Sequence, residues 1–392
     1  MRNPGRVGVA VSGGSDSLAL LHGLLDAGAQ TMVATVDHGL RDGAAEEAAE
    51  VERQCTALGV SHDILRRTDV PGGNLQADAR KARYRLLADW AAGHGLRTLV
   101  LGHTLNDQAE TFLLRLKRGS GVDGLSGMAM ESRRHGLTLW RPLLGRCRED
   151  LRAYLRHKGV VWADDPSNDD MAFDRVKARK ILKVLSELGL HAEDFSQVAA
   201  RMARARQALE EATLALARQV AEVYNIGSVA LDVPALSAAP AELRLRLIAH
   251  TLCWVASADY RPRANALDRL WAAMMDERPH TLHGCMGHPI RGRFYEIVRE
   301  IAVMPVSENI GAYDTRWVCD PSAGTVAPLT KKGMRDCPEW RATGWSGIAL
   351  AASPSLWRDG ELLSAPFAGK AGAWTCRLKG GAESFFSSIL KY

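Results

Sequence analysis

Long apolar segments are absent from this 392-residue sequence, and none approaches the length needed to cross a bilayer. The apolar stretch near its start, Val7–Val11, ends at a Ser-Gly-Gly turn and is too short for a signal peptide. The seven cysteines are scattered and include no Cys-x-x-Cys pair, which argues against a zinc site and against a disulfide framework. We therefore expect a protein of the reducing cytoplasm that has no membrane partner.

A strong charge imbalance is also lacking, since the net charge is only +5. The composition, 46% hydrophobic and 24% charged, is that of a globular chain, and its length suggests two or three domains. Arginine outnumbers lysine, and its planar guanidinium donates paired hydrogen bonds to phosphate. The mild basic excess therefore fits a polyanionic partner, although a solvated charged surface explains it equally well.

Short apolar segments alternate with amphipathic helical segments through the first half of the chain. We expect strands at residues 6–11, 31–36, 61–65, 98–101 and 137–140, with helices between them. This alternation predicts an α/β fold with a doubly wound, mostly parallel sheet. Ser12, Asp37 and His103 each follow a predicted strand, and such sheets bind ligands at the carboxyl ends of their strands. We expect these three residues to share one site.

A glycine- and serine-rich loop lies between the first predicted strand and the helix that follows. Its residues are Ser12, Gly13, Gly14, Ser15, Asp16 and Ser17. Glycines permit a tight turn that leaves hydroxyl and N–H groups at the helix N-terminus, where phosphate binds. No Gly-Lys-Ser/Thr follows, so this is not a Walker A loop. A simple Gly-Ser turn is the alternative, but the preceding strand favours a phosphate-binding loop.

Three polar residues share one face of the helix that follows the fourth predicted strand. His103, Asp107 and Glu110 are spaced by four and three residues. Two carboxylates and an imidazole beside a phosphate loop suit an ammonium group or a metal ion. The alternative is a solvated acidic first turn, which the helix dipole favours in any case.

Arginines form a stripe further along the chain. Arg148, Arg152 and Arg156 are spaced by four residues, and Arg175 and Arg179 lie in a second basic segment. Basic stripes of this kind bind the RNA backbone, and a solvated helix face is the alternative.

The composition changes near Phe173, where the sequence becomes rich in Ala, Leu and Arg, and again after about residue 278, where Gly, Pro and Trp become frequent. We expect a catalytic nucleotide-binding domain over residues 1–190 and a helical domain over 191–305. A small region with β content is expected over 306–392.

The loop at residues 12–17 resembles the PP-loop of N-type ATP pyrophosphatases, which split ATP into AMP and pyrophosphate. Four further segments follow in order, at residues 36–41, 79–84, 103–111 and 118–125. Together they resemble the tRNA(Ile)-lysidine synthetases. Many members of that family have Asp-Asp where this chain has Asn106-Asp107. Residues 164–168 also resemble the family's loop before a basic helix.

The resemblance implies an ATP-dependent ligase. Free L-lysine would be joined to C2 of the wobble cytidine, position 34, in the isoleucine tRNA with a CAU anticodon. The reaction would pass through an adenylated cytidine and release AMP and pyrophosphate. Residues 191–305 and 306–392 would contact the tRNA.

The resemblance also implies roles for individual residues. The loop would bind the β- and γ-phosphates of ATP, with Mg2+ near Asp16. Asp107 and Glu110 would bind lysine, and His103 would contact the α-phosphate or assist proton transfer. The remaining catalytic candidates are Asp37 and Arg83.

Other readings stay open at this stage. A tRNA thiolase has the same loop, but such enzymes usually need catalytic cysteines, and only Cys55 and Cys147 lie in the first half of the chain. A small-molecule amidating ligase is disfavoured by segment 118–125 and by the basic helices. A non-catalytic RNA-binding protein is disfavoured by the intact loop and by the three polar residues on one helical face.

Overall fold

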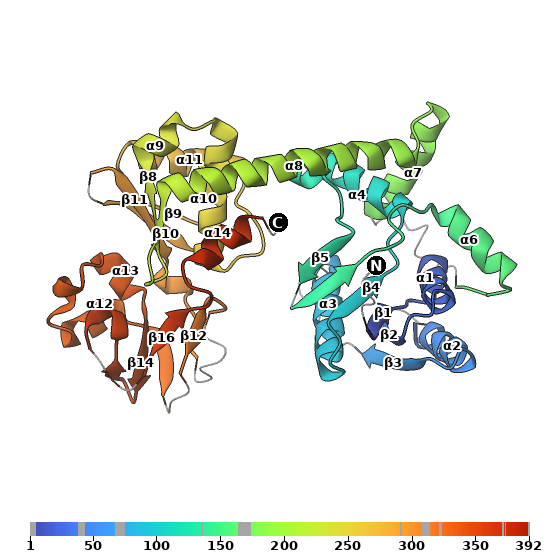
Figure 1. Ribbon diagram of the computed structural model, residues 1–392, viewed down its shortest axis with the longest axis horizontal. Coiled ribbons are helices and arrows are strands. Elements are labelled where there is room, and N and C mark those ends of the chain that lie inside the picture. The colour runs from blue at the N-terminus through green and yellow to red at the C-terminus, as the bar shows by residue number, and fades with distance from the viewer. Residues whose placement is uncertain are drawn as a thin grey trace. The chain divides into compact units, whose positions relative to one another are not determined.

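The computed structural model describes residues 5–37, 44–66, 75–134, 136–163, 174–290, 292–307, 314–320, 324–370, 372 and 374–390. The chain forms two compact units, Met1–Arg206 and Gln207–Tyr392. The boundary between them falls inside the 29-residue helix α8 (Ala192–Val220) (Figure 1). In the part of the chain that is described, no helix is long and apolar enough to cross a membrane.

The first unit is built on a six-stranded sheet with the order β3-β2-β1-β4-β6-β5. Its strands are β1 (Val7–Ala10), β2 (Thr31–Asp37), β3 (Ser61–Arg66), β4 (Thr98–Leu101), β5 (Glu131–Arg134) and β6 (Leu137–Trp140). All neighbouring strands are parallel except β5, which runs antiparallel to β6. The expected doubly wound, mostly parallel sheet is confirmed. Strand order reverses between β1 and β4, and at such a point ligands bind in open α/β sheets.

Helices cover both faces of this sheet. They are α1 (Ser15–Asp26), α2 (Ala44–Ala57), α3 (Leu75–Gly93), α4 (Leu105–Lys117), α5 (Val122–Leu125), α6 (Arg148–His157) and α7 (Asp174–Glu187). Val7 and Val9 of β1 pack with α1, α2 and α6, whereas Ala10 packs with α3 on the opposite face (Figure 1). Gly8 also faces α3, where a Cβ would lie 2.8 Å from the Trp90 ring. The alternation along β1 therefore fixes a three-layer arrangement.

The second unit contains a five-stranded antiparallel sheet with the order β7-β8-β11-β10-β9. Its strands are β7 (Ala221–Val223), β8 (Val229–Asp232), β9 (His280–Leu282), β10 (Cys285–Ile290) and β11 (Phe294–Arg299). The accompanying helices are α9 (Val233–Ala238), α10 (Ala241–Ala256), α11 (Ala264–Met275) and, from the chain's end, α14 (Glu383–Ile389). Their shared core includes Leu247, Leu270, Tyr295 and Phe385.

Two smaller sheets complete the second unit and confirm the expected β content after residue 306. One pairs β12 (Trp317–Cys319) with β16 (Cys376–Leu378), and the other joins β13 (Thr325–Pro328), β14 (Pro354–Arg358) and β15 (Glu361–Ser364). The short helical elements of this part of the unit are α12 (Thr330–Gly333), α13 (Gly347–Ala351) and the 3-10 turns η2 (Ile301–Val303), η4 (Met334–Asp336), η5 (Trp340–Thr343) and η6 (Pro366–Ala368). The division of this unit at residue 305 stays a prediction.

One sequence-based expectation about cysteine is wrong. Cys319 and Cys376 form a disulfide between β12 and β16, where the two residues lie directly opposite each other. They are 57 residues apart in the sequence. A search for closely spaced cysteines therefore cannot predict this disulfide. The pairing of β12 with β16 brings the two residues together.

Candidate active site

The glycine- and serine-rich loop joins β1 to α1 at the carboxyl edge of the sheet. Gly13 adopts φ +83°, a left-handed conformation that favours glycine. The Ser12 N–H donates to the Ser17 hydroxyl at 3.1 Å, and this hydroxyl donates to the Gly14 carbonyl at 2.9 Å. Gly14 is the N-cap of α1 and supplies no side-chain acceptor. The helix N-terminus can therefore offer its N–H groups to an external anion.

The loop lies against the end of β4. A Cβ on Gly102 would lie 3.0 Å from the Asp16 carbonyl oxygen and 3.1 Å from the Ser17 Cα. Glycine permits this close approach of two backbones, and any larger residue would push the loop away from β4. The segments that follow β1 and β4 thus meet where the strand order reverses, as the sequence predicted for Ser12 and His103.

Helix α4 places two buried carboxylates beside the loop. Thr104 and Asp107 form a capping box, in which Asp107 Oδ2 accepts from the Thr104 N–H at 2.9 Å and from its hydroxyl at 3.0 Å. Asp107 Oδ1 faces arginines instead. Glu110, one turn later, is fully buried, and its Oε2 has no hydrogen-bond partner among the described residues. A buried, unpartnered carboxylate oxygen is a strong acceptor for a ligand.

Arg148 of α6 contacts three acids in this site, which we call the acidic cluster: Asp16, Asp107 and Glu110. Its Nε donates to Asp16 Oδ2 at 2.9 Å. Its terminal nitrogens lie 3.7 Å from Asp107 Oδ1 and 3.9 Å from Glu110 Oε1. The guanidinium therefore links the phosphate loop to the acids of α4.

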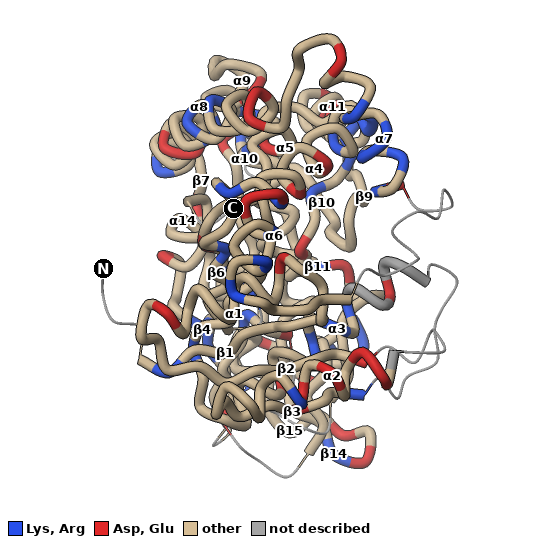
Figure 2. Tube along the Cα trace, turned by 90° about the vertical axis from the view of Figure 1, so that its right-hand side faces the viewer, with Lys and Arg blue, Asp and Glu red and all other residues tan. Residues whose placement is uncertain are grey.

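Helix α7 adds two more arginines to the same acids. Arg179 Nε donates to Glu110 Oε1 at 2.7 Å, and an Arg175 terminal nitrogen lies 3.6 Å from Asp107 Oδ1. Figure 2 shows further basic residues along α7. Three of them, Lys177, Lys180 and Lys183, are exposed. Arg175 and Arg179 thus turn toward the acidic cluster, and the lysines face solvent.

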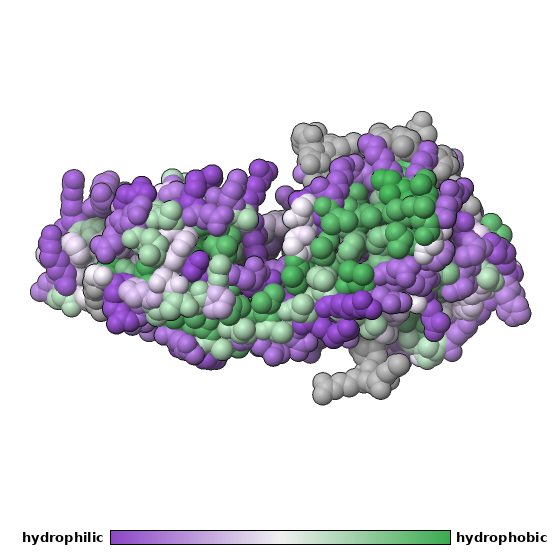
Figure 3. Space-filling model, turned by 90° about the horizontal axis from the view of Figure 1, so that it is seen from above, coloured by the Kyte–Doolittle hydropathy of each residue, from purple (hydrophilic) through white to green (hydrophobic). Residues whose placement is uncertain are grey.

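Helix α7 also exposes apolar side chains, so its outer face is not uniformly basic. Ile181 and Val184 are exposed on the helix, and Leu188 is exposed directly after its end. Seen from above in Figure 3, the end of the first unit that carries α7 shows apolar surface bordered by hydrophilic residues.

The pKa values of the two acids of α4 are shifted in opposite directions. Burial opposes ionisation of Asp107, but Arg148, the Thr104 N–H and Arg175 together hold its pKa below the ordinary value. Burial and the neighbouring Asp107 charge raise the pKa of Glu110, and Arg179 only partly offsets them. Glu110 is therefore the carboxylate that takes up a proton more readily.

His103 is neutral near physiological pH. Burial lowers the pKa of its imidazole to about 3, and the positive charges of Arg141 and Arg83 oppose protonation further, against the attraction of Asp107. Its Nδ1 has no hydrogen-bond partner among the described residues. His103 can therefore donate or accept a hydrogen bond but does not supply a positive charge.

Comparison with known proteins gives a consistent picture. A family model for the PP-loop domain matches residues 2–185. A tRNA(Ile)-lysidine synthase of Ruegeria pomeroyi is 43% identical over 399 residues, which cover 99% of this chain and 95% of the relative. One of Wolbachia pipientis wMel is 31% identical, covering 92% and 88%. The chain belongs to the tRNA(Ile)-lysidine synthase family. Among solved structures, the U34-tRNA thiolase NcsA of Methanococcus maripaludis matches 52% of this chain and 74% of its own at 16% identity, with a TM-score of 0.45.

The family that the sequence motifs predicted is thus confirmed. The remaining predicted site residues lie on β2, α3 and α6. Asp37 ends β2, and Arg83 lies on α3 close enough to affect the His103 pKa. Arg152 and Arg156 continue along α6 from Arg148, and exposed Arg156 pairs with Glu149 at 2.8 Å. Arg83 therefore lies near His103, and Asp37 lies at the carboxyl end of β2. Along α6, Arg148 is bonded to Asp16, whereas Arg156 is exposed.

Sequence reasoning missed Arg141. This buried arginine follows β6 directly, donates to the Ala129 carbonyl at 2.9 Å and to the Ser132 hydroxyl at 3.0 Å, and lies near His103. An arginine immediately after a predicted apolar strand was the available signal. Among the predicted motifs, residues 38–41, the Arg80 side chain and residues 164–168 lie outside the described residues.

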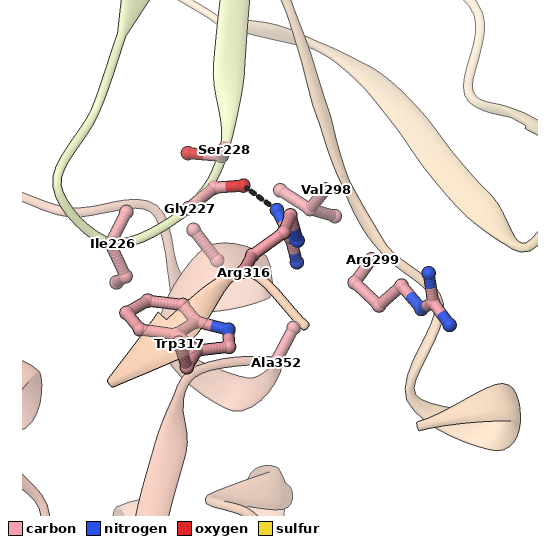
Figure 4. A pocket seen from close by; sticks show the side chains of 9 residues that line it. Ile226, Gly227, Ser228, Val298, Arg299, Arg316, Trp317 and Ala352 are labelled. Carbon is pink, nitrogen blue, oxygen red and sulfur yellow. Dashed lines mark hydrogen bonds between the residues drawn. The ribbon is translucent and has the colours of Figure 1, made fainter. Parts of the chain in front are cut away.

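A separate cavity in the second unit has a volume of about 10 Å3 (Figure 4). Arg316 lines it and donates to the Gly227 carbonyl at 2.8 Å, beside Trp317. This volume is enough for about one water molecule. It cannot accommodate a nucleotide.

Proposed function

We propose that the protein uses ATP to join free L-lysine to C2 of the wobble cytidine in the CAU-anticodon isoleucine tRNA, in accord with the name of its relatives. The observation that carries this proposal is the pair of buried carboxylates on α4 beside the phosphate loop. Glu110 Oε2 lacks a partner among the described residues, and Asp107 Oδ1 has only contacts of 3.6 and 3.7 Å. An ammonium group with three donors would satisfy both acceptors.

The loop at residues 12–17 would bind the β- and γ-phosphates of ATP at the uncapped N-terminus of α1. Mg2+ binds through one or two carboxylates together with substrate phosphates and water, and Asp16 offers one carboxylate at this position. Within the described ranges, no group of three or more His, Cys, Asp or Glu could hold a metal without such help. The donor set thus fits Mg2+ bound jointly with ATP, where the ion would neutralise triphosphate charge.

In the first step, the C2 carbonyl oxygen of cytosine attacks the α-phosphate, and pyrophosphate leaves. The protein's part is chiefly positioning and charge stabilisation. Neutral His103, beside the end of β4, would bind the α-phosphate through an N–H hydrogen bond. Arg83 and Arg141 would add positive charge on the same side.

In the second step, a lysine amine attacks C2, and AMP leaves. The attacking amine must lose a proton, and a carboxylate with a raised pKa accepts one more readily than an ordinary carboxylate does. Glu110 fits this role because burial raises its pKa. Asp107, whose pKa is lowered, would stay ionised and hold the ammonium of the substrate.

Recognition of the tRNA would extend beyond the catalytic unit. The exposed lysines of α7 and the arginines Arg152 and Arg156 of α6 would contact the phosphate backbone. Residues 191–305 and 306–392 would contact parts of the tRNA outside the anticodon. Such contacts would separate the isoleucine tRNA from methionine tRNAs with the same anticodon, because the anticodons alone do not differ.

The thiolase reading is not favoured. Burial raises the pKa of the Cys55 thiol to about 11, with a smaller contribution from Glu52, so this cysteine is a poor nucleophile. The curated relatives that match most of this chain are lysidine synthases.

The deciding experiment incubates the purified full chain with ATP, Mg2+, L-lysine and unmodified tRNA transcripts, followed by mass spectrometry of the nucleosides. We expect AMP, pyrophosphate and a lysine-containing cytidine from the isoleucine tRNA only. Formation of ADP and orthophosphate would refute the chemistry. Equal lysine incorporation into methionine tRNA would refute the specificity and leave the chemistry standing.

A further inference from the structure

Arg148 makes one short and two long contacts to acids, and it is the arginine of the site that contacts all three acids of the cluster. One short bond, 2.9 Å to Asp16, anchors the guanidinium beside the phosphate loop. The two contacts to Asp107 and Glu110, at 3.7 and 3.9 Å, are too long for good hydrogen bonds. They neutralise charge without donating a hydrogen bond, and Glu110 Oε1 accepts its bond from Arg179 instead.

The backbone of Arg148 is held as well. Cys147, the N-cap of α6, supplies no side-chain acceptor. Asn106 Oδ1 accepts from the Arg148 N–H at 2.8 Å and so takes over this capping role from α4. The helix that carries Arg148 is therefore fixed by the residue immediately before Asp107. An aspartate at position 106 would offer the same acceptor.

These contacts remove Arg148 from the RNA-binding stripe that the spacing of α6 suggested. Its side chain is only 22% exposed, compared with 58% for Arg156 on the same helix. A guanidinium that is already bound to Asp16 and surrounded by three carboxylates is not available to an RNA phosphate.

We propose that Arg148 is the resident cation of the amine site, anchored on Asp16 and fixed by Asn106, and that the substrate ammonium replaces its long contacts to Asp107 and Glu110. This inference rests on the proposed function, since it assigns the ammonium to those acids. Before lysine binds, Arg148 neutralises the buried acids. When lysine binds, its ammonium competes with that positive charge, so Arg148 lowers the affinity of the empty site for cations and acts as a specificity-determining residue.

The test measures L-lysine binding to the full chain by calorimetry, without ATP or tRNA. Arg148→Met should tighten lysine binding by at least about tenfold, or about 1.4 kcal/mol, because Arg148 no longer competes, whereas Arg175 and Arg179 are present in wild type and variant alike. Arg148→Lys, which retains a charge, should stay near wild type. A purely structural role predicts the opposite, since a disrupted site binds more weakly. Unchanged or weaker binding by Arg148→Met would overturn the proposal.

A second pair of variants covers the case in which Arg148→Met does not fold. Asn106→Asp keeps the acceptor for α6 and should bind lysine as wild type does. Asn106→Ala releases α6 and should bind lysine more tightly, and equal affinities for the two would overturn the proposal. Arg53→Met, an exposed arginine of α2 that pairs with Glu50, is the control and should change nothing.

Two other outcomes distinguish a failure of the proposed function from a failure of the role assigned to Arg148. If wild type forms no lysine-dependent AMP with tRNA, the proposed function fails, and this inference fails with it. If wild type is active but Arg148→Met changes only tRNA affinity and its salt dependence, the inference alone fails, and Arg148 is an RNA contact.

Discussion

The close approach of Gly102 to the phosphate loop gives the sharpest mutational prediction. In Gly102→Ala, the new Cβ would lie 3.0 Å from the Asp16 carbonyl oxygen and 3.1 Å from the Ser17 Cα. Ordinary contacts of this kind are about 3.5 Å or longer. The neighbours are backbone atoms, which cannot rotate away, so the loop must shift by a few tenths of an ångström. Overpacking of this kind costs about 1–3 kcal/mol of stability.

Function should suffer as well as stability. A misplacement of about 1 Å at a reacting group can lower a rate by about a hundredfold, so a shift of a few tenths of an ångström should lower the rate of pyrophosphate release by about threefold to tenfold. Pyrophosphate release at saturating ATP, tRNA and lysine measures this rate, and urea unfolding measures the stability. Gly93→Ala is the matched control, because a Cβ there meets nothing within 4 Å. If Gly102→Ala behaved as Gly93→Ala does in both assays, the close approach would have no role in placing the loop.

Three further predictions concern other parts of the molecule. Asp107→Asn should raise the KM for lysine by about tenfold or more while ATP use changes less, because an amide oxygen can still cap α4; equal losses in both would indicate an ATP or metal role. His103→Asn should flatten the dependence of stability on pH between 6.5 and about 3, because wild-type His103 stays neutral in the fold but protonates when unfolded, so wild type loses stability as the pH falls through that window. Urea unfolding at several pH values measures this dependence, and the same slope in variant and wild type would contradict the prediction. A chain that ends near residue 190 should still bind ATP but lose tRNA affinity, most of it the salt-dependent part; modification of tRNA at the wild-type rate would exclude a substrate role for the rest.

The strands around the site could be predicted because short apolar runs stand between clear turn signals. Prediction and structure agree at β4 (residues 98–101) and β6 (residues 137–140), and differ by one residue at the end of β2 and β3. The strand β5, Glu-Ser-Arg-Arg, has no apolar residue and forms only because it pairs with β6 at the sheet edge. Periodicity cannot identify such a strand, since its stability comes from a partner.

The region expected to be helical also contains strands. The pattern of α8 continues into Ala221–Val223, which nevertheless forms β7 by pairing with β8. Strand β8, Val-Ala-Leu-Asp, is buried at all four positions and so lacks the alternation that marks a strand with one exposed face. Short, fully buried segments are ambiguous between helix and strand, and tertiary pairing decides between them.

The direction of arginine side chains could not be predicted from spacing. Arg148, Arg152 and Arg156 repeat every four residues, which predicts one face, yet Arg148 bonds Asp16 and Arg156 is exposed. The contact that turns Arg148 inward is with Asp16, which lies 132 positions away in the sequence. A long guanidinium chain reaches whichever acid the fold brings near, so spacing gives the helix face but not the partner.

Asp107 shows why the functional and structural readings of one residue need not compete. The sequence offered an acidic first turn as the alternative to a ligand-binding carboxylate. In the structure, Oδ2 closes the capping box with Thr104, and Oδ1 lies beside Arg148 and Arg175. The cap fixes the carboxylate so that its other oxygen is held toward the site. A binding group is more effective when its orientation is already determined, because less conformational entropy is lost on binding. The helix-capping role of Asp107 therefore contributes directly to its proposed role in binding the substrate ammonium.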